Sequence, residues 1–241
     1  MSTGSGNASP SDTGRAVPIE LVCLDMAGTT VEDGGLVESA FSTALDALGV
    51  GSGSGGADER GRMLEHVRLT MGTSKIEVFR TLFGEESAAQ RANAAFEHAY
   101  DDLVAAGNAH PIPGAEEAMA AIRASGRKVA LLTGFSPSTR DRLIAALGWN
   151  DVADLTLCPA EAGRGRPSPD LVLTALLRLG ISDVAAVAVS GDTAADMASG
   201  RAAGASIVAG VLTGSDPAER LWAGGATHVL DTVADLPALL R

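Results

Sequence analysis

Residues 19–30, IELVCLDMAGTT, decide the fold of this 241-residue chain. Ile19 to Leu24 form a short apolar run, and its length and the flanking glycine favour a buried β-strand over a helix. The run ends at Asp25, and the string AGTT follows. Because ligands of open α/β sheets bind outside the carboxyl ends of the strands, Asp25 marks a candidate functional site.

The segment after this strand has a helical pattern. The tripeptide DGG at 33–35 is a turn signal. Apolar residues then recur at three- and four-residue spacing, with a Gly/Ser-rich break at 49–58, and no strand signal occurs before Pro111–Gly114. We therefore expect residues 36–110 to form an all-helical cap, with a hinge at each end.

Beyond residue 111 short apolar runs alternate with helical patterns. Strands are expected at 128–132, 155–158, 185–189, 206–211 and 227–230. This alternation predicts right-handed βαβ units and a parallel sheet covered by helices on both faces. The sequence thus predicts an α/β fold, with a Rossmann-like core made of residues 18–35 and 111–241 and the helical cap inserted into it. Residues 1–17 are rich in Ser, Gly and Thr and are expected to be a disordered tail.

Composition excludes several function classes. The formal net charge is −12, so the surface repels nucleic-acid phosphates and anionic lipid headgroups. No apolar run approaches the roughly 18–20 residues of a membrane span. The two cysteines, Cys23 and Cys158, lie in apolar runs, which predicts core packing in a reducing, cytoplasmic environment. An anionic ligand would need a local cation to overcome the net charge.

Four strand ends carry polar residues in a particular order. The strings are DMAGTT from Asp25, LLTG ending at Gly134, GRPSP from Gly165 and SGDTAADM from Ser190. Over residues 19–215 these strings and their order resemble the haloacid dehalogenase superfamily. The resemblance implies that Asp25 is a carboxylate nucleophile that forms an aspartyl-phosphate, which divides one difficult step into two easier ones.

The resemblance also assigns the surrounding groups. Thr133 and the Gly134 backbone N–H would hold a phosphoryl oxygen, and Arg166 would neutralise the phosphoryl charge, where most relatives use lysine.

A magnesium ion is the cofactor that the resemblance implies. Asp25, Asp192 and the Ala27 carbonyl would hold Mg²⁺, and Asp196 would orient a water ligand or Asp192. Mg²⁺ prefers few carboxylates together with water and substrate oxygens, which this set allows.

Ala27 departs from the superfamily pattern. Most phosphatases of the superfamily have a second aspartate there, which protonates the leaving oxygen. Without this acid, hydrolysis of ordinary phosphomonoesters would be slower by about 10²–10⁴-fold. The leaving group should therefore be one that needs no protonation on oxygen.

The cap segment MGTSKIEVFR, residues 71–80, narrows the resemblance. Together with DMAGTT and the arginine of GRPSP it resembles the phosphonoacetaldehyde hydrolase family and its phosphonatase-like relatives. The resemblance implies that Lys75 forms a Schiff base with the substrate aldehyde, with Met71 and Gly72 beside it. The protonated imine accepts the electrons of the C–P bond, so no acid on oxygen is needed, in agreement with Ala27.

Three positions depart from that family. It has a histidine where this chain has Val78, an aromatic hydroxyl where this chain has Phe135, and a cysteine near Gly35. The group that moves protons around the imine and the exact 2-oxoalkylphosphonate are therefore open.

Two other functions also stay open. One is a phosphatase or phosphotransferase that acts on an activated phosphorylated metabolite, with Lys75 only contacting the substrate. The other is a non-catalytic protein that binds a phosphorylated metabolite, which the intact nucleophile disfavours. The resemblance further implies a homodimer formed through the cap.

Overall fold

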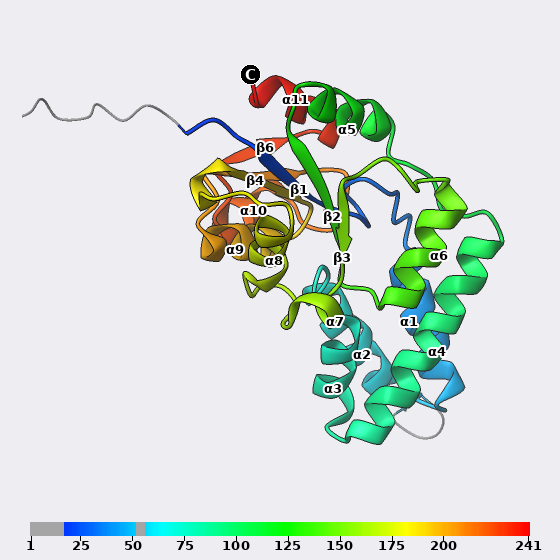
Figure 1. The fold of residues 1–241 in the computed structure, drawn as a ribbon. Helices are drawn as coiled ribbons and strands as arrows, with labels where there is room; N and C mark the ends of the chain where they lie inside the picture. Colours follow the sequence, from blue (N-terminus) through cyan, green and yellow to red (C-terminus); the bar gives the residue numbers. More distant parts are fainter. Residues whose placement is uncertain (1–16, 52–55) are drawn as a thin grey trace, which may run out of the picture.

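The computed structural model describes residues 17–51 and 56–241 (Figure 1). The predictions for the tail and for the Gly/Ser-rich break lie outside the described residues at 1–16 and 52–55. Six strands form one parallel sheet in the order β3-β2-β1-β4-β5-β6. They are β1 (Leu21–Asp25), β2 (Lys128–Leu132), β3 (Leu155–Leu157), β4 (Val187–Gly191), β5 (Ile207–Val211) and β6 (His228–Leu230). The predicted α/β fold with a parallel sheet is confirmed.

Strand β1 is central because it pairs with β2 on one side and β4 on the other. Asp25 lies opposite Leu132 of β2, and Leu24 lies opposite Ser190 of β4. The strand order reverses direction at β1, and crevices at such switch points are where open α/β sheets bind ligands. The topology therefore places Asp25 at the expected binding position.

Both faces of the sheet are buried. Leu21 and Cys23 of β1 pack in the hydrophobic cluster on one face of the sheet, whereas Val22 and Leu24 pack in the cluster on the other face. This alternation follows from the two-residue period of a strand. The helices are α5 (Ala115–Ala124), α6 (Pro137–Leu147), α7 (Pro159–Ala162), α8 (Asp170–Arg178), α9 (Ala194–Ala203), α10 (Ala218–Gly224) and α11 (Leu236–Leu239). Cys23 and Cys158 are free and buried, as predicted.

Helices fill the segment between β1 and α5. They are α1 (Leu36–Ala47), α2 (Gly56–Leu69), α3 (Lys75–Phe83) and α4 (Glu86–Ala105). Figure 1 shows them at one end of the molecule, away from α5 and α11. Phe41 of α1 packs against Phe79 of α3 and Phe96 of α4, with ring centroids 4.7 and 4.6 Å from its own. We call these helices the cap; its boundaries as a separate domain stay a prediction.

The start of β4 differs from the prediction. The apolar run at 185–189 was expected to be the strand, but Val184–Ala186 form a 3₁₀ turn, and the strand is Val187–Gly191. The Asp183 side chain caps this turn by accepting a hydrogen bond from the Ala185 N–H at 2.8 Å. Apolar composition alone does not locate such a cap. The shift carries the strand two residues further, so that Asp192 directly follows it.

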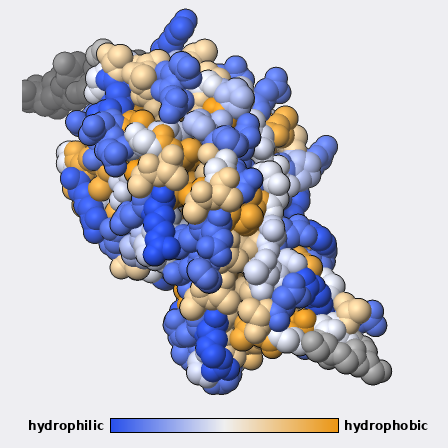
Figure 2. Space-filling view, turned by 90° about the vertical axis from the view of Figure 1, so that its right-hand side faces the viewer, coloured by the Kyte–Doolittle hydropathy of each residue, from blue (hydrophilic) through white to orange (hydrophobic). Residues whose placement is uncertain are grey.

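The surface agrees with the acidic composition. Hydrophilic residues cover most of the face drawn in Figure 2, and apolar residues occur in small groups between them. Among the described helices, none is both long and apolar enough to span a bilayer. The homodimer through the cap and the cytoplasmic location stay predictions.

Candidate active site

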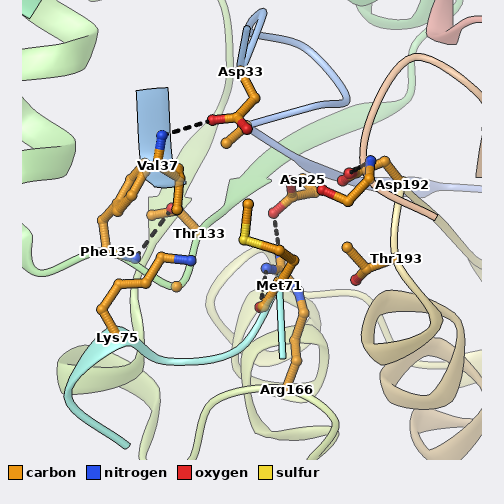
Figure 3. A pocket seen from close by; sticks show the side chains of 14 residues that line it. Asp25, Asp33, Val37, Met71, Lys75, Thr133, Phe135, Arg166, Asp192 and Thr193 are labelled. Carbon is orange, nitrogen blue, oxygen red and sulfur yellow. Dashed lines mark hydrogen bonds and ion pairs between the residues drawn. The ribbon is translucent and has the colours of Figure 1, made fainter. Parts of the chain in front are cut away.

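A cavity lies at the carboxyl edge of the sheet, under the cap (Figure 3). The empty space between its lining atoms amounts to about 340 Å³, including a part that is open to solvent. Nine of the ten site residues predicted from the sequence line it, namely Asp25, Ala27, Met71, Gly72, Lys75, Thr133, Gly134, Arg166 and Asp192. The tenth, Asp196, contacts Arg166. The fold therefore brings these residues together, while their chemical roles stay predictions.

Asp25 and Arg166 form a buried ion pair at the centre of the site. The Arg166 Nη2 atom lies 2.7 Å from Asp25 Oδ1, and the two residues are 6% and 5% exposed. The guanidinium also donates hydrogen bonds to the carbonyls of Leu132, at 2.9 Å, and Gly72, at 3.2 Å. Burial raises the pKa of Asp25 well above its usual range, although Arg166 opposes this effect.

Two further carboxylates follow β4. Asp192 accepts hydrogen bonds from the Ser215 N–H at 2.7 Å and the Thr29 hydroxyl at 3.3 Å. Burial, together with the charge of Asp196, raises the pKa of Asp192 to about 7. Asp196 lies 2.7 Å from Arg166 Nε and completes the capping box of α9 with Thr193. Asp196 thus holds Arg166, and its predicted role toward a water ligand stays a prediction.

The charges of the site are suited to a divalent cation. Asp25, Asp192 and Asp196 are buried around one guanidinium, and burial raises the pKa of Asp25 and Asp192, so a bound cation would favour their ionised forms. Within residues 17–51 and 56–241, no group of three His, Cys, Asp or Glu side chains could hold a metal. A cation between Asp25 and Asp192 would need the Ala27 carbonyl, water and substrate oxygens as further ligands. Mg²⁺ has this preference, so the residues fit it.

The end of β2 is in direct contact with the cap. Thr133 is buried and its hydroxyl accepts a hydrogen bond from the Phe135 N–H at 3.2 Å. A Cβ atom on Gly134 would lie 2.5 Å from the Thr73 carbonyl oxygen, so only glycine allows the cap to approach this closely. The Lys75 N–H donates to the Gly134 carbonyl at 3.3 Å.

Gly72 makes the second close contact between cap and core. Its φ is +82°, and a Cβ atom there would lie 2.3 Å from the Thr193 hydroxyl oxygen. Its carbonyl accepts the hydrogen bond from Arg166 described above. The cap loop thus closes over the site through backbone contacts that a side chain would prevent.

Gly72→Ala should open this contact and lower turnover by about 10-fold or more, because a positive φ alone costs an alanine about 1–2 kcal/mol. The rate of product release and the Tm of both proteins would be measured. Gly61→Ala in α2 is the matched control, since nothing lies within 4 Å of a Cβ atom there. Wild-type turnover in Gly72→Ala would contradict the role of this contact.

Lys75 is one of two lysines in the chain, the other being Lys128. It begins α3, is 7% exposed and places its Nζ 5.6 Å from the centre of the Phe135 ring. Burial lowers the pKa of Lys75, and Arg166 adds to this effect, while Asp33 and Asp25 oppose it. A lowered pKa increases the fraction of neutral amine, which is the nucleophilic form.

Asp33 is the main lining residue that sequence reasoning missed. We assigned it only to a turn, yet it lines the cavity together with Lys75 and accepts a hydrogen bond from the Val37 N–H at 3.1 Å. Its position at the junction of core and cap was the available signal. Val78 stands at the position where the resembled family has a histidine. It is 4% exposed and packs in the hydrophobic core.

Comparison with known proteins agrees with this geometry. Residues 19–204 match the sequence model of the haloacid dehalogenase-like hydrolases. The chain is 29% identical to a phosphonoacetaldehyde hydrolase of Pseudomonas fluorescens, over 92% of this chain and 91% of that protein. A phosphonoacetaldehyde hydrolase-like protein from Oleispira antarctica is similar in structure, with a TM-score of 0.80, 25% identity and coverage of 97% and 95%. CbbY from Rhodobacter sphaeroides in complex with phosphate shares the fold, with a TM-score of 0.74, 21% identity and coverage of 90% and 96%.

Proposed function

Because the chain belongs to the haloacid dehalogenase-like hydrolase family, we propose that it is a Mg²⁺-dependent phosphonatase. Its substrate would be phosphonoacetaldehyde or a related 2-oxoalkylphosphonate. The observation that carries this proposal is the buried amine of Lys75, which shares one cavity with the Asp25 carboxylate. The similarity to phosphonoacetaldehyde hydrolases supports the same substrate class.

Lys75 starts the reaction. Its neutral amine adds to the carbonyl carbon of the substrate, and the carbinolamine loses water to give a protonated imine. Burial favours this step because it lowers the pKa of the amine. The imine prepares the C–P bond for cleavage, since its positive nitrogen can accept an electron pair.

Asp25 then attacks phosphorus. A P–O bond forms to the carboxylate while the C–P bond breaks, and its electron pair moves into the C=C bond of a neutral enamine on Lys75. Protonation of the enamine carbon and addition of water release the aldehyde. A second water hydrolyses the aspartyl-phosphate to inorganic phosphate and returns Asp25 to its starting form.

The remaining groups hold the phosphonate. Arg166, Thr133 and the Gly134 N–H would bind its oxygens beside Asp25. When bound, Mg²⁺ supplies positive charge to the phosphoryl oxygens. Asp25, Asp192 and the Ala27 carbonyl would hold it.

A phosphatase or phosphotransferase is the second candidate, because CbbY in complex with phosphate shares this fold. Ala27 argues against ordinary phosphomonoesters, since it lines the cavity and offers no acid to a leaving oxygen. A protein that only binds phosphorylated metabolites would not need a nucleophile. Neither candidate explains a buried amine as directly.

Ala27→Asp should raise hydrolysis of simple phosphomonoesters by about 10²-fold, the lower end of what general acid catalysis contributes. The substitution restores a carboxyl group beside the leaving oxygen. Rates on a simple alkyl phosphate and on phosphonoacetaldehyde would be compared for both proteins. The argument from Ala27 is wrong if the wild-type protein already hydrolyses the ester as fast as the phosphonate.

The proposed function is tested by incubating the protein with phosphonoacetaldehyde and Mg²⁺ and measuring phosphate and acetaldehyde together. We expect equal amounts of both products and loss of both after chelation. Phosphate release from esters alone would favour the phosphatase. Binding without either product would favour the non-catalytic protein.

A further inference from the structure

The proposed function requires a group that gives and takes a proton beside Lys75. Loss of water from a carbinolamine needs an acid, and addition of water to the imine needs a base. The described lining of the cavity contains five titratable side chains, which are Asp25, Asp33, Lys75, Arg166 and Asp192. Arg166 stays protonated, and Asp25 and Asp192 already have roles as nucleophile and metal ligand. Asp33 has none.

We propose that Asp33 is the general acid–base residue of the Lys75 imine chemistry. This proposal rests on the proposed function and adds to it a catalytic residue from the loop between β1 and α1. Asp33 lies in sequence between the nucleophile Asp25 and the first cap helix, where the chain passes from core to cap.

The loop fixes the Asp33 carboxylate toward the cavity. Its Oδ1 accepts a hydrogen bond from the Val37 N–H, so the side chain is anchored to the start of α1. Figure 3 shows Asp33 and Lys75 beside the cavity, together with Asp25, each from a different part of the chain. Asp33 therefore reaches the substrate from the loop, while Lys75 reaches it from the cap.

The charges of Asp33 and the Lys75 amine act on one another. Among the carboxylates that raise the pKa of Lys75, Asp33 has a larger effect than Asp25 or Asp192. Burial raises the pKa of Asp33 itself, although the Val37 N–H and the charge of Lys75 oppose this. Asp33 can therefore hold a proton at a higher pH than an exposed aspartate does.

Two other groups face Asp33. Glu38 on α1 is part-exposed, and its charge adds to the raised pKa of Asp33. The Tyr100 hydroxyl on α4 is buried and has no hydrogen-bond partner among the residues that the structure describes, and burial together with Asp33 raises its pKa. Tyr100 thus keeps its proton, which leaves Asp33 as the group that titrates.

Asp33 passes one proton in each direction during a reaction cycle. Protonated Asp33 gives its proton to the carbinolamine hydroxyl, which leaves as water while the nitrogen lone pair forms the C=N bond. The Asp33 carboxylate then faces the positive iminium. After C–P cleavage the enamine carbon takes a proton from solvent, which is balanced by the proton that the second water releases when it hydrolyses the aspartyl-phosphate. The Asp33 carboxylate then takes a proton from the water that attacks the iminium carbon. Asp33 is thereby returned to its protonated form.

Asp33→Asn tests the proposal, because the amide oxygen can still accept the Val37 hydrogen bond but the group cannot titrate. The probe is phosphonoacetaldehyde, and the readouts are the rate of borohydride-trapped adduct on Lys75 and the rate of phosphate release, each across pH 5–9. We expect both rates to fall about 10²-fold or more, as for loss of a general acid. The wild-type trapping rate should decline as pH rises through the Asp33 pKa, and this decline should vanish in the variant.

A purely electrostatic role predicts the opposite sign. Removing the charge of Asp33 lowers the pKa of Lys75 further, so more neutral amine is present at a given pH. Trapping at low pH would then become faster in Asp33→Asn. Glu38→Gln is the matched control, because it removes a negative charge near Asp33 from a residue outside the cavity lining. It should keep the decline of the trapping rate with rising pH that Asp33→Asn loses.

The outcomes separate the inference from the proposed function. A wild-type protein that forms no adduct and no phosphate overturns both. Wild-type activity with unchanged or faster trapping in Asp33→Asn overturns the inference alone. If Asp33→Asn does not fold, Asp33→Ser replaces it, since a serine hydroxyl is also a hydrogen-bond acceptor and does not titrate in this pH range. The same 10²-fold loss in Asp33→Ser supports the inference, and a wild-type rate overturns it.

Discussion

Lys75→Arg should abolish cleavage of phosphonoacetaldehyde, with a loss of about 10³-fold or more, because a guanidinium stays protonated and cannot form an imine. The substitution keeps the positive charge that faces Asp33 and Asp25. A phosphatase that used Lys75 only to attract an anion would retain much of its activity. The measurement is phosphate release together with borohydride trapping.

The second lysine of the chain provides the control for this experiment. Lys128 is the only other lysine; its side chain is 49% exposed and lies 3.2 Å from Asp154 at the opposite edge of the sheet. Lys128→Arg should keep full activity and full trapping. A reduced adduct on Lys75 blocks tryptic cleavage there, so the peptide 69–80 should appear uncut in wild type.

A larger arginine in a buried position can also disturb packing. Lys75→Met, which is similar in length and uncharged, serves as the second variant. Both variants should lose cleavage while their Tm stays close to wild type. Cleavage at the wild-type rate in either variant, with no adduct on the wild-type protein, would exclude the Schiff base.

Much of the fold could be predicted because parallel strands buried on both faces leave a strong signal. The run at 128–132 coincides with β2, since every residue after the exposed Lys128 is buried. The strand predicted at 185–189 lies two residues further along the chain, because the side-chain cap of the preceding turn, rather than hydropathy, decides where β4 begins. Apolar residues occur both in the 3₁₀ turn and in the strand, so hydropathy does not mark the boundary between the two.

The site could be predicted where a residue stands at a strand end. Asp25, Thr133 and Asp192 follow β1, β2 and β4 or end them, so the parallel topology alone brings them to one edge. Asp33 could not be found this way, because it lies in a loop whose sequence signals only a turn. Its approach to Lys75 depends on how the cap folds back over the core, which no local pattern encodes.

An acidic protein can bind the proposed anionic substrate if a cation is buried in the cavity. Arg166 is 6% exposed, so the field of its guanidinium acts where screening by water and salt is weakest. The net charge of −12 acts mainly from the exposed surface. A phosphonate in the cavity would therefore meet the guanidinium of Arg166 at short range, while the overall charge acts from further away.

Asp25→Asn should abolish phosphate release, with a loss of about 10³-fold or more, because an amide cannot form the aspartyl-phosphate. The isosteric amide oxygen can still accept the hydrogen bond of Arg166. Since burial raises the pKa of Asp25, the ionised carboxylate costs stability at neutral pH. The Tm of the metal-free variant should therefore equal or exceed that of wild type.

Asp154→Asn is the matched control, with the opposite expected signs. Asp154 precedes β3 at the amino-terminal edge of the same sheet, 3.3 Å from Arg123 Nε. Burial raises the pKa of Asp154, but the hydrogen bonds from the Val129 N–H and Lys128 outweigh this effect and lower the pKa. The charge of Asp154 therefore stabilises the fold. This variant should lose stability and keep activity, whereas Asp25→Asn should lose activity and keep stability. Phosphate release near the wild-type rate in Asp25→Asn, with a reduced Tm, would show that Asp25 is a structural carboxylate and that phosphorus is attacked by another group.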